Sequence, residues 1–332
     1  MHYKLLGNSG LRVSEVGLGT NTFGTEWAIG TDKDNARAIF EAYAEAGGNF
    51  IDTANTYALG SSEKFIGEFM AADREKFVLA TKFSMTTGTH PNAGGNQRKN
   101  MIASLHASLK RLKVDYIDLY YLHAWDGVTP LEEVMRAFDD MVRAGKVLYV
   151  GISDTPAWVV ARMLTMAEIR GWTRPAAIQI EHSLVARTPE RELIPMAKAL
   201  GLGVVSWYAL GAGVLTGKYN DPAGQGRLAS DSPYLNSRNL AIAAEVVNVA
   251  RDIGRPPSQV AINWVRQQHA GSIPLIGSRS AEQTLENLGC LDFELAEDHL
   301  RRLDAVSQVD LGFPQNFLNR ESMRDTLKRD FR

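Results

Sequence analysis

The sequence predicts an α/β protein with the (β/α)8 TIM barrel fold, and three observations support this. Short apolar runs alternate with segments of helical period along the chain. The runs are continuously apolar, as expected for strands covered on both faces. Eight of them fit within 332 residues, which is typical of a (β/α)8 barrel. We expect a single barrel domain over residues 1–332, with an open doubly wound sheet as the alternative.

The eight expected strands are spread from the N-terminal region to residue 276. They are Val16–Gly19, Asn49–Asp52, Phe77–Thr81, Ile117–Leu122, Val147–Gly151, Ala177–Ile180, Val204–Trp207 and Ile273–Ile276. Helices are expected between them. Thr129, Pro130 and Glu132 predict a capped helix start with proline in the first turn. Another helix is expected to open at Thr155-Pro156 and to close at Gly171.

Several segments interrupt this alternation. Residues 3–14 predict a short hairpin that could plug the bottom of the barrel. Residues 84–99 and 211–239 are long loops rich in glycine, proline and polar residues, and loops of this length are usually functional. Residues 309–332 have mixed charge and few apolar side chains, so we expect this tail to cover a surface.

The charge balance limits the classes of partner. Lys plus Arg total 36 and Asp plus Glu total 38, which gives a formal net charge of -2. This balance gives no electrostatic reason to expect nucleic acid or an anionic membrane as a partner. The uncharged stretch 199–217 contains five glycines, so a buried strand and a glycine-rich loop explain it better than a membrane span.

The single cysteine, Cys290, excludes an internal disulfide and thiolate-rich metal sites, and we expect a buried, inert thiol. We expect no metal site elsewhere, since His123 is the one histidine at an expected strand end. The N-terminal residues lack the apolar stretch of a signal peptide, so a cytoplasmic location is the expectation.

Polar, ionisable residues gather at the carboxyl ends of three successive strands, where barrel enzymes carry their working groups. These residues are Asp52, Lys82 and His123, and Tyr57 lies five residues beyond Asp52. Each has an ordinary alternative: a turn aspartate, a loop tyrosine, a rim lysine and a half-buried histidine. Their joint position at consecutive strand ends favours a catalytic group.

This group suits proton transfer to a carbonyl oxygen. A free tyrosine has a pKa near ~10, and a neighbouring ammonium is expected to lower it. Asp52 would hold Lys82 in place, and His123 would donate a hydrogen bond to the substrate oxygen. Because the group contains no nucleophile, a cofactor would supply hydride. The dinucleotide fingerprint G-x-G-x-x-G is absent after the first strand, so a nicotinamide cofactor would need a non-Rossmann site.

Several ordered motifs resemble those of the aldo-keto reductase family. The segment Gly48-Asn49-Phe50-Ile51-Asp52-Thr53-Ala54-Asn55-Thr56-Tyr57 resembles the family signature and continues as Gly60-Ser61-Ser62-Glu63. Later blocks are similar in order: 80–82, 121–123, 151–153, 179–181, 215–218 and 273–279. The resemblance runs from about Tyr3 to Leu291, in the style of the bacterial and potassium-channel-β-like branches.

The resemblance implies a role for each part of the site. Tyr57 would be the general acid in carbonyl reduction and the base in alcohol oxidation, tuned by Lys82 and Asp52, and His123 would help to bind the carbonyl. Further residues would bind the cofactor from the nicotinamide through the pyrophosphate to the adenosine: Ser153, Asp154, Gln179, Trp207, Leu210, Gly211, Leu215, Lys218, Gly277, Ser278, Arg279, Gln283 and Asn287.

Arg279 favours NADP(H) over NAD(H), because a guanidinium fork matches the oxygens of a 2′-phosphate and the eighth loop of a barrel is a frequent phosphate site. Asp154 departs from the pattern, since the family often has Asn there. An ionised Asp only accepts hydrogen bonds, so it would contact the carboxamide NH2.

Three aromatic residues that follow the first and fourth strands, Phe23, Trp27 and Trp125, are candidates for the wall of a substrate pocket. Such walls suit an apolar or stacked aldehyde or ketone, although ordinary packing at the rim would also explain them. The expected function is reversible, NADP(H)-dependent reduction of small-molecule aldehydes or ketones to alcohols. The alternatives are a cofactor-binding regulatory protein similar to potassium-channel β subunits and an unrelated barrel metal enzyme.

Overall fold

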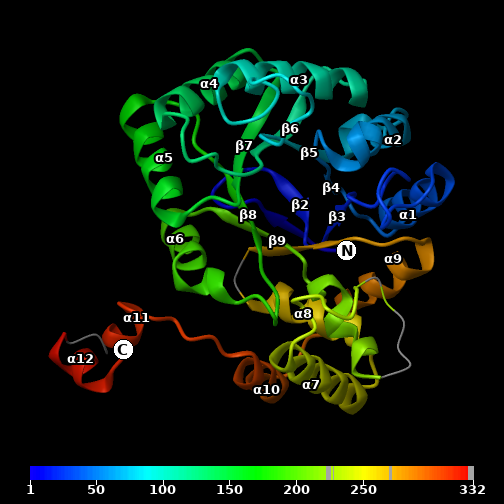
Figure 1. The fold of residues 1–332 in the computed structure, drawn as a ribbon, viewed down its shortest axis with the longest axis vertical. Coiled ribbons are helices and arrows are strands. Elements are labelled where there is room, and N and C mark those ends of the chain that lie inside the picture. The colour runs from blue at the N-terminus through cyan, green and yellow to red at the C-terminus, as the bar shows by residue number, and fades with distance from the viewer. Residues whose placement is uncertain (222–225, 227, 269–270, 328–332) are drawn as a thin grey trace.

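Eight parallel strands close into a barrel at the centre of the molecule (Figure 1). The computed structural model describes residues 1–221, 226, 228–268 and 271–327. Within them the strands pair in the order β10-β3-β4-β5-β6-β7-β8-β9. Their bounds are β3 Gly17–Gly19, β4 Phe50–Asp52, β5 Val78–Phe83, β6 Ile117–Leu122, β7 Val147–Ser153, β8 Ala177–Glu181, β9 Gly203–Trp207 and β10 Ser272–Ile276. Each expected strand is confirmed, with ends that shift by at most two residues.

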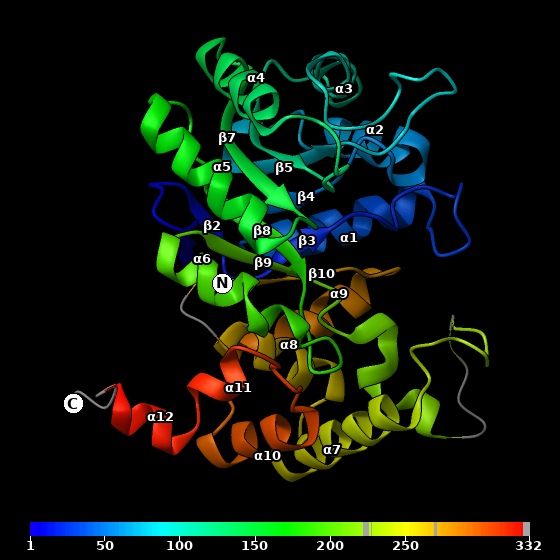
Figure 2. The same cartoon turned by 60° about the vertical axis from the view of Figure 1, so that its left-hand side comes forward.

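Helices surround the barrel (Figures 1 and 2). Those that follow β3 to β8 are α1 Lys33–Glu45, α2 Ser61–Phe69, α3 Arg98–Leu112, α4 Leu131–Arg143, α5 Ala157–Arg170 and α6 Leu193–Leu200. The later helices are α7 Ser237–Ile253, α8 Pro257–Gln268, α9 Ala281–Leu288, α10 Glu297–Ser307, α11 Gln315–Leu318 and α12 Glu321–Thr326.

Helix α5 closes at Gly171 in the left-handed conformation, as expected. Helix α4 departs from its expected cap. It begins at Leu131 with Pro130 at the cap position and no side-chain cap, and Thr129 lies one residue earlier, where its hydroxyl donates to Asp126 at 2.6 Å.

The N-terminal hairpin closes the bottom of the barrel. Strands β1 Tyr3–Leu5 and β2 Arg12–Ser14 pair antiparallel, and Leu6 and Val13 are fully buried against residues of the barrel strands. Gly7 lies so close to Gly203 that an added Cβ would stand 2.5 Å from the Gly203 nitrogen. Gly7 also has φ +57°, so glycine is required for this contact.

A buried polar network fixes α2 and α3 against β5. Glu63 has no solvent exposure, and its carboxylate accepts hydrogen bonds from the Thr81 hydroxyl at 2.6 Å and from Arg111 Nε at 2.6 Å. Because successive strand residues point to opposite faces, Thr81 reaches outward to Glu63 while its neighbour Lys82 reaches into the barrel. The ion pair therefore positions the strand that carries the expected lysine.

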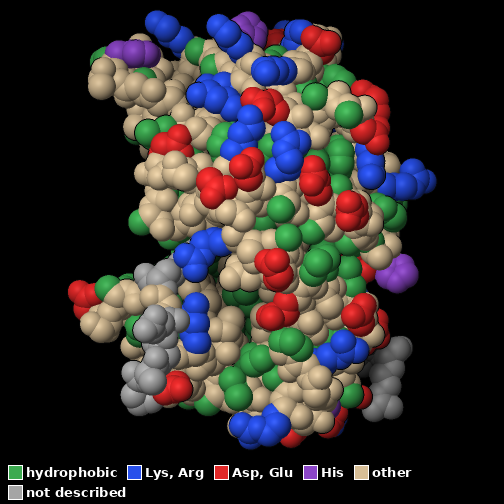
Figure 3. Space-filling model, turned by 90° about the vertical axis from the view of Figure 1, so that its right-hand side faces the viewer, with side chains coloured by type: hydrophobic (Ala, Val, Ile, Leu, Met, Phe, Trp, Pro, Cys, Tyr) green, Lys and Arg blue, Asp and Glu red, His purple; other side chains and the backbone are tan. Residues whose placement is uncertain are grey.

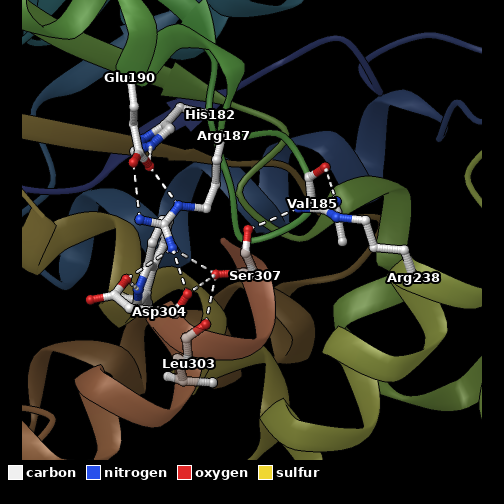
Figure 4. Close-up of polar contacts among 9 residues, drawn as sticks. His182, Val185, Arg187, Glu190, Arg238, Leu303, Asp304 and Ser307 are labelled. Carbon is white, nitrogen blue, oxygen red and sulfur yellow. Dashed lines mark hydrogen bonds and ion pairs between the residues drawn. The ribbon is translucent and has the colours of Figure 1, made fainter. Parts of the chain in front are cut away.

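A second network ties the loop after β8 to α10 (Figure 4). Both oxygens of Glu190 accept from the Arg187 guanidinium, which also donates to the Ser307 hydroxyl at 2.7 Å, and His182 bonds the same carboxylate at 3.1 Å. Burial opposes ionisation of Glu190, but the hydrogen bonds from His182 and Arg187 hold its pKa at about 2. Glu190 is thus charged at neutral pH.

The C-terminal tail departs from its expected position. In Figures 1 and 2, α12 extends away from the barrel instead of covering it. The amide of Gln315 bonds the Arg191 carbonyl at 2.8 Å, whereas α12 has no buried residue. Residues 328–332, like 222–225 and 227 of the long loop 211–239, lie outside the described residues.

Cys290 is fully buried, as expected, and burial raises the pKa of its thiol to about 12. No helix in the described part of the chain is long and apolar enough to cross a bilayer. The face in Figure 3 carries interspersed acidic and basic side chains, without a large area of one sign.

Candidate active site

The carboxyl ends of β4 and β5 bring the predicted aspartate and lysine together inside the barrel. Lys82 has no solvent exposure, and its Nζ donates to Asp52 Oδ2 at 2.5 Å and to the Thr53 carbonyl at 2.9 Å. The same Nζ lies 3.2 Å from the hydroxyl of Tyr57. The parallel pairing of β4 with β5 places Asp52 and Lys82 close together, as predicted from the sequence.

Tyr57 is directed at Lys82 by a tight turn. Ala58 and Leu59 adopt left-handed φ values of 44° and 50°, which are costly for residues with a Cβ. The phenol ring lies between two other rings, with centroids 6.1 Å from Trp27 and 6.0 Å from His123. The turn thus holds the hydroxyl at the lysine.

The pKa of Tyr57 is raised, which is the opposite of the net direction expected from the sequence. Burial raises it, and the charge of Lys82 acts in the expected direction but does not outweigh burial. The phenol therefore keeps its proton at neutral pH, which is the form that can donate a proton.

His123 is neutral at neutral pH. Burial and the charge of Lys82 lower the pKa of its imidazole to about 3. Its Nδ1 is buried and has no hydrogen-bond partner among the described residues. A neutral imidazole with one N–H can donate a hydrogen bond to a substrate oxygen without adding charge.

Gln179 joins the group from β8. Its amide Nε2 donates to Asp52 Oδ1 at 2.8 Å, so both oxygens of this carboxylate are bonded. The side chain that the resemblance assigned to the nicotinamide carboxamide thus also fixes Asp52. This bond leaves the carbonyl oxygen of the Gln179 amide available to accept a hydrogen bond.

A cavity of about 430 Å3 opens above these residues, within the size range of small-molecule sites. Many predicted residues line it: Asp52, Tyr57, His123, Ser153, Asp154, Gln179, Trp207, Leu210, Lys218, Gly277, Ser278, Arg279 and Gln283. Lys82 lies beneath the lining, in contact with Asp52 and Tyr57. Gly211, Leu215 and Asn287 are buried and do not line the cavity.

None of the three aromatic residues predicted to form a wall lines the cavity. Phe23 is fully buried and packs against Phe69, with ring centroids 6.4 Å apart, so it belongs to the core. Trp27 packs edge-on against the ring of Tyr57, which lines the cavity, but is not itself part of the lining. Trp125 packs against Trp158, with centroids 5.6 Å apart, and is not part of the lining.

Other lining residues were not predicted. They are Gly19, Thr20, Asn21, Thr22, Ile29, Tyr208, Ala209, Ala212, Gly213, Ile262, Leu275 and Ile276. Gly19 ends β3 and residues 20–22 follow it, so the strand-end rule that located Asp52 and Lys82 also applies to them.

The far end of the cavity is suited to an anionic group. The backbone at Ala212 and Gly213 is left-handed, with φ values of 57° and 89°, and Lys218 lines the wall beside it. Arg279 is exposed, and its guanidinium makes no ion pair within the described part of the chain. Helix α9 begins two residues later, capped by Ser280, whose side chain accepts from the Gln283 nitrogen.

Comparison with known proteins identifies the family. The family model described as "Aldo/keto reductase family" matches residues 15–308. A norsolorinic acid reductase of Emericella nidulans is 38% identical over 93% of this chain and 82% of its own. An aryl-alcohol dehydrogenase [NADP(+)] of Phanerodontia chrysosporium is 34% identical over 94% of this chain and 87% of its own.

A norsolorinic acid reductase of Aspergillus flavus is 35% identical over 96% of this chain and 84% of its own. All three of these relatives are fungal enzymes. They do not support the expected placement in the bacterial and potassium-channel-β-like branches. They do support carbonyl reduction by an oxidoreductase. With its closed barrel and matching family model, the chain belongs to the aldo/keto reductase family.

Proposed function

We propose that this protein reduces aromatic aldehydes or ketones with NADPH, and that Tyr57 gives the proton. The observation that carries the proposal is the contact between the hydroxyl of Tyr57 and the ammonium of Lys82 at the wall of the cavity. The aromatic class comes from the names of the relatives and from the ring of Trp27, which packs against that of Tyr57.

The lining residues fit a nicotinamide dinucleotide. Ser153 has a buried hydroxyl with no hydrogen-bond partner among the described residues, next to Gln179 across the β7–β8 pair. Both are suited to a carboxamide. Lys218 would lie at the pyrophosphate, and Arg279 with Gln283 at the adenosine end. When bound, the cofactor supplies the hydride that reduces the carbonyl carbon.

His123 and Tyr57 have different roles at the carbonyl oxygen of the substrate. The neutral imidazole of His123 donates a hydrogen bond that orients this oxygen. The phenol of Tyr57 gives its proton as negative charge develops there, and the ammonium of Lys82 stabilises the resulting phenolate. Asp52 and Gln179 keep that ammonium in place.

The preference for NADPH rests on Arg279. Its guanidinium lines the cavity without an ion-pair partner in the described part of the chain, and a phosphate dianion is the ligand that this group binds best. NADH lacks that phosphate.

Turnover tests the proposal. Oxidation of NADPH and of NADH is followed by absorbance with a panel of aromatic and aliphatic aldehydes and ketones of similar size. We expect faster reduction with NADPH and lower KM values for the aromatic members. Failure to turn over any carbonyl with either cofactor would overturn the proposed activity, and equal efficiency with both cofactors would overturn the NADPH assignment alone.

A further inference from the structure

Asp154 introduces a carboxylate at the end of the cavity proposed to hold the nicotinamide. It directly follows β7 and lines the cavity together with Tyr57, Gln179 and Trp207. Its backbone has φ +36°, in the positive range that Asp and Asn tolerate better than other residues with a Cβ. Either residue would therefore fit the backbone here, but only Asp brings a charge.

Among the described residues, the Asp154 carboxylate has no cationic partner within ion-pair distance. Its Oδ1 accepts a hydrogen bond from the Trp207 indole at 3.2 Å, and no Lys, Arg or His of the described residues forms an ion pair with it. Burial raises the pKa of Asp154, and the bond from the Trp207 indole and the more distant charge of Lys82 oppose this only in part, since that ammonium is already paired with Asp52.

The surroundings of Asp154 add no compensating charge. Its neighbours Ser153 and Gln179 are uncharged, and His123 is neutral. Glu181, at the end of β8, adds a second carboxylate whose charge interacts with that of Asp154. Since Asp52 and Lys82 cancel each other, this end of the cavity carries net negative charge when Asp154 is ionised, while Glu181 lies outside the lining.

The two redox forms of a nicotinamide differ in charge. The oxidised ring is a cation, and uptake of a hydride makes it neutral. A fixed carboxylate nearby stabilises the cation and leaves the neutral ring almost unaffected. Asn at position 154 would keep the hydrogen-bond acceptor and remove this discrimination.

Given the proposed function, we propose that Asp154 is a specificity-determining residue that strengthens binding of the oxidised cofactor relative to the reduced one. The Asp154 charge also acts on the phenol, since it adds to burial, the main cause of the raised Tyr57 pKa. The groups that face Asp154 from neighbouring elements are Glu181, Lys82, Tyr57 and Trp207.

The test compares wild type with Asp154→Asn, in which the amide oxygen can still accept from the Trp207 indole. Dissociation constants of NADP+ and NADPH are measured by calorimetry at one pH and ionic strength. We expect the affinity for NADP+ to fall about tenfold relative to that for NADPH, as for one unit charge at short range in a partly hydrated site. The exposed Glu294, outside the cavity, gives the control Glu294→Gln with the same change in net charge and an unchanged ratio.

A second readout separates charge from structure. The alkaline limb of carbonyl reduction should move to lower pH in Asp154→Asn, because one charge that raises the phenol pKa is gone. If Asp154→Asn folds poorly by circular dichroism, Asp154→Ser replaces it with the same expectations.

An unchanged ratio of affinities and an unmoved alkaline limb in a folded variant would overturn the inference. Wild type that binds neither NADP+ nor NADPH would instead overturn the proposed function. The two failures are therefore distinguishable.

Discussion

The two ends of the cavity are built differently. At the end proposed for the nicotinamide, Lys82 and Asp52 are buried, lie on barrel strands and are bonded to each other and to Gln179. At the other end, Arg279 and Gln283 are exposed and lie on the loop after β10 and in the first turn of α9. The buried end has its geometry set by the fold alone. The exposed end offers charge that a ligand can satisfy.

The comparison predicts that substitutions at the buried end change the rate, whereas those at the exposed end change cofactor affinity. Tyr57→Phe should have the largest effect. It removes the proton donor, so kcat for carbonyl reduction should fall about 10²- to 10⁴-fold. Steady-state kinetics measures this loss, and NADPH titration should show unchanged binding. A variant that reduced substrates at the wild-type rate would show that another group gives the proton.

Lys82→Met should have the second-largest effect on activity. It removes the charge that stabilises the phenolate and leaves Asp52 buried without its partner, which destabilises proteins by about 3–5 kcal/mol. We expect kcat to fall by about 10²-fold and the urea midpoint to fall as well. The double variant Asp52→Asn with Lys82→Met is the control, since it should regain stability without regaining activity. Full activity of the single variant would remove Lys82 from the mechanism.

The pH dependence of the wild type tests the sign of the phenol shift. Since burial raises the Tyr57 pKa above its ordinary value of 10.0, the phenol stays protonated through neutral and mildly alkaline pH. The kcat/KM for reduction should be flat there with respect to this group and fall about tenfold per pH unit only above the raised pKa. An apparent pKa of the phenol below 10.0 would show that the Lys82 charge outweighs burial in solution.

Arg279→Ala should act at the exposed end alone. Loss of the guanidinium should raise the dissociation constant of NADPH about tenfold, the scale of one charge-assisted hydrogen bond, and leave that of NADH unchanged. Calorimetry measures both constants. Arg279→Lys should give an intermediate value, because it keeps the charge but not the planar fork. An equal loss for both cofactors would contradict a phosphate contact.

Ser280→Ala should have the smallest effect. The Ser280 side chain caps α9 by accepting from the Gln283 nitrogen, so its loss should lower the free energy of unfolding by about 1 kcal/mol. Urea denaturation measures this change, while kcat should stay at the wild-type value. A drop in kcat would mean that the two ends of the cavity are coupled.

The sequence predicted the buried end well because parallel strands align their carboxyl ends. Asp52, Lys82 and His123 followed from that rule, and Tyr57 from its spacing and the family resemblance. The burial of the other candidate residues was harder to predict from the sequence. The burial of Phe23, Leu215 and Asn287 depends on how loops and helices fold back, which no local pattern encodes. The direction of the Tyr57 pKa shift could not be predicted from the sequence either, because the residues that bury the phenol are distant from it in the sequence.

Thr81 and Lys82 are consecutive on β5, yet one holds the carboxylate beneath α2 and α3 and the other holds the reacting phenol. A single peptide unit thus joins the outer helical layer to the proposed proton donor. Substitutions at Arg111, on the periphery of the molecule, should therefore be found among the variants with altered kcat when a random library of this protein is screened for activity.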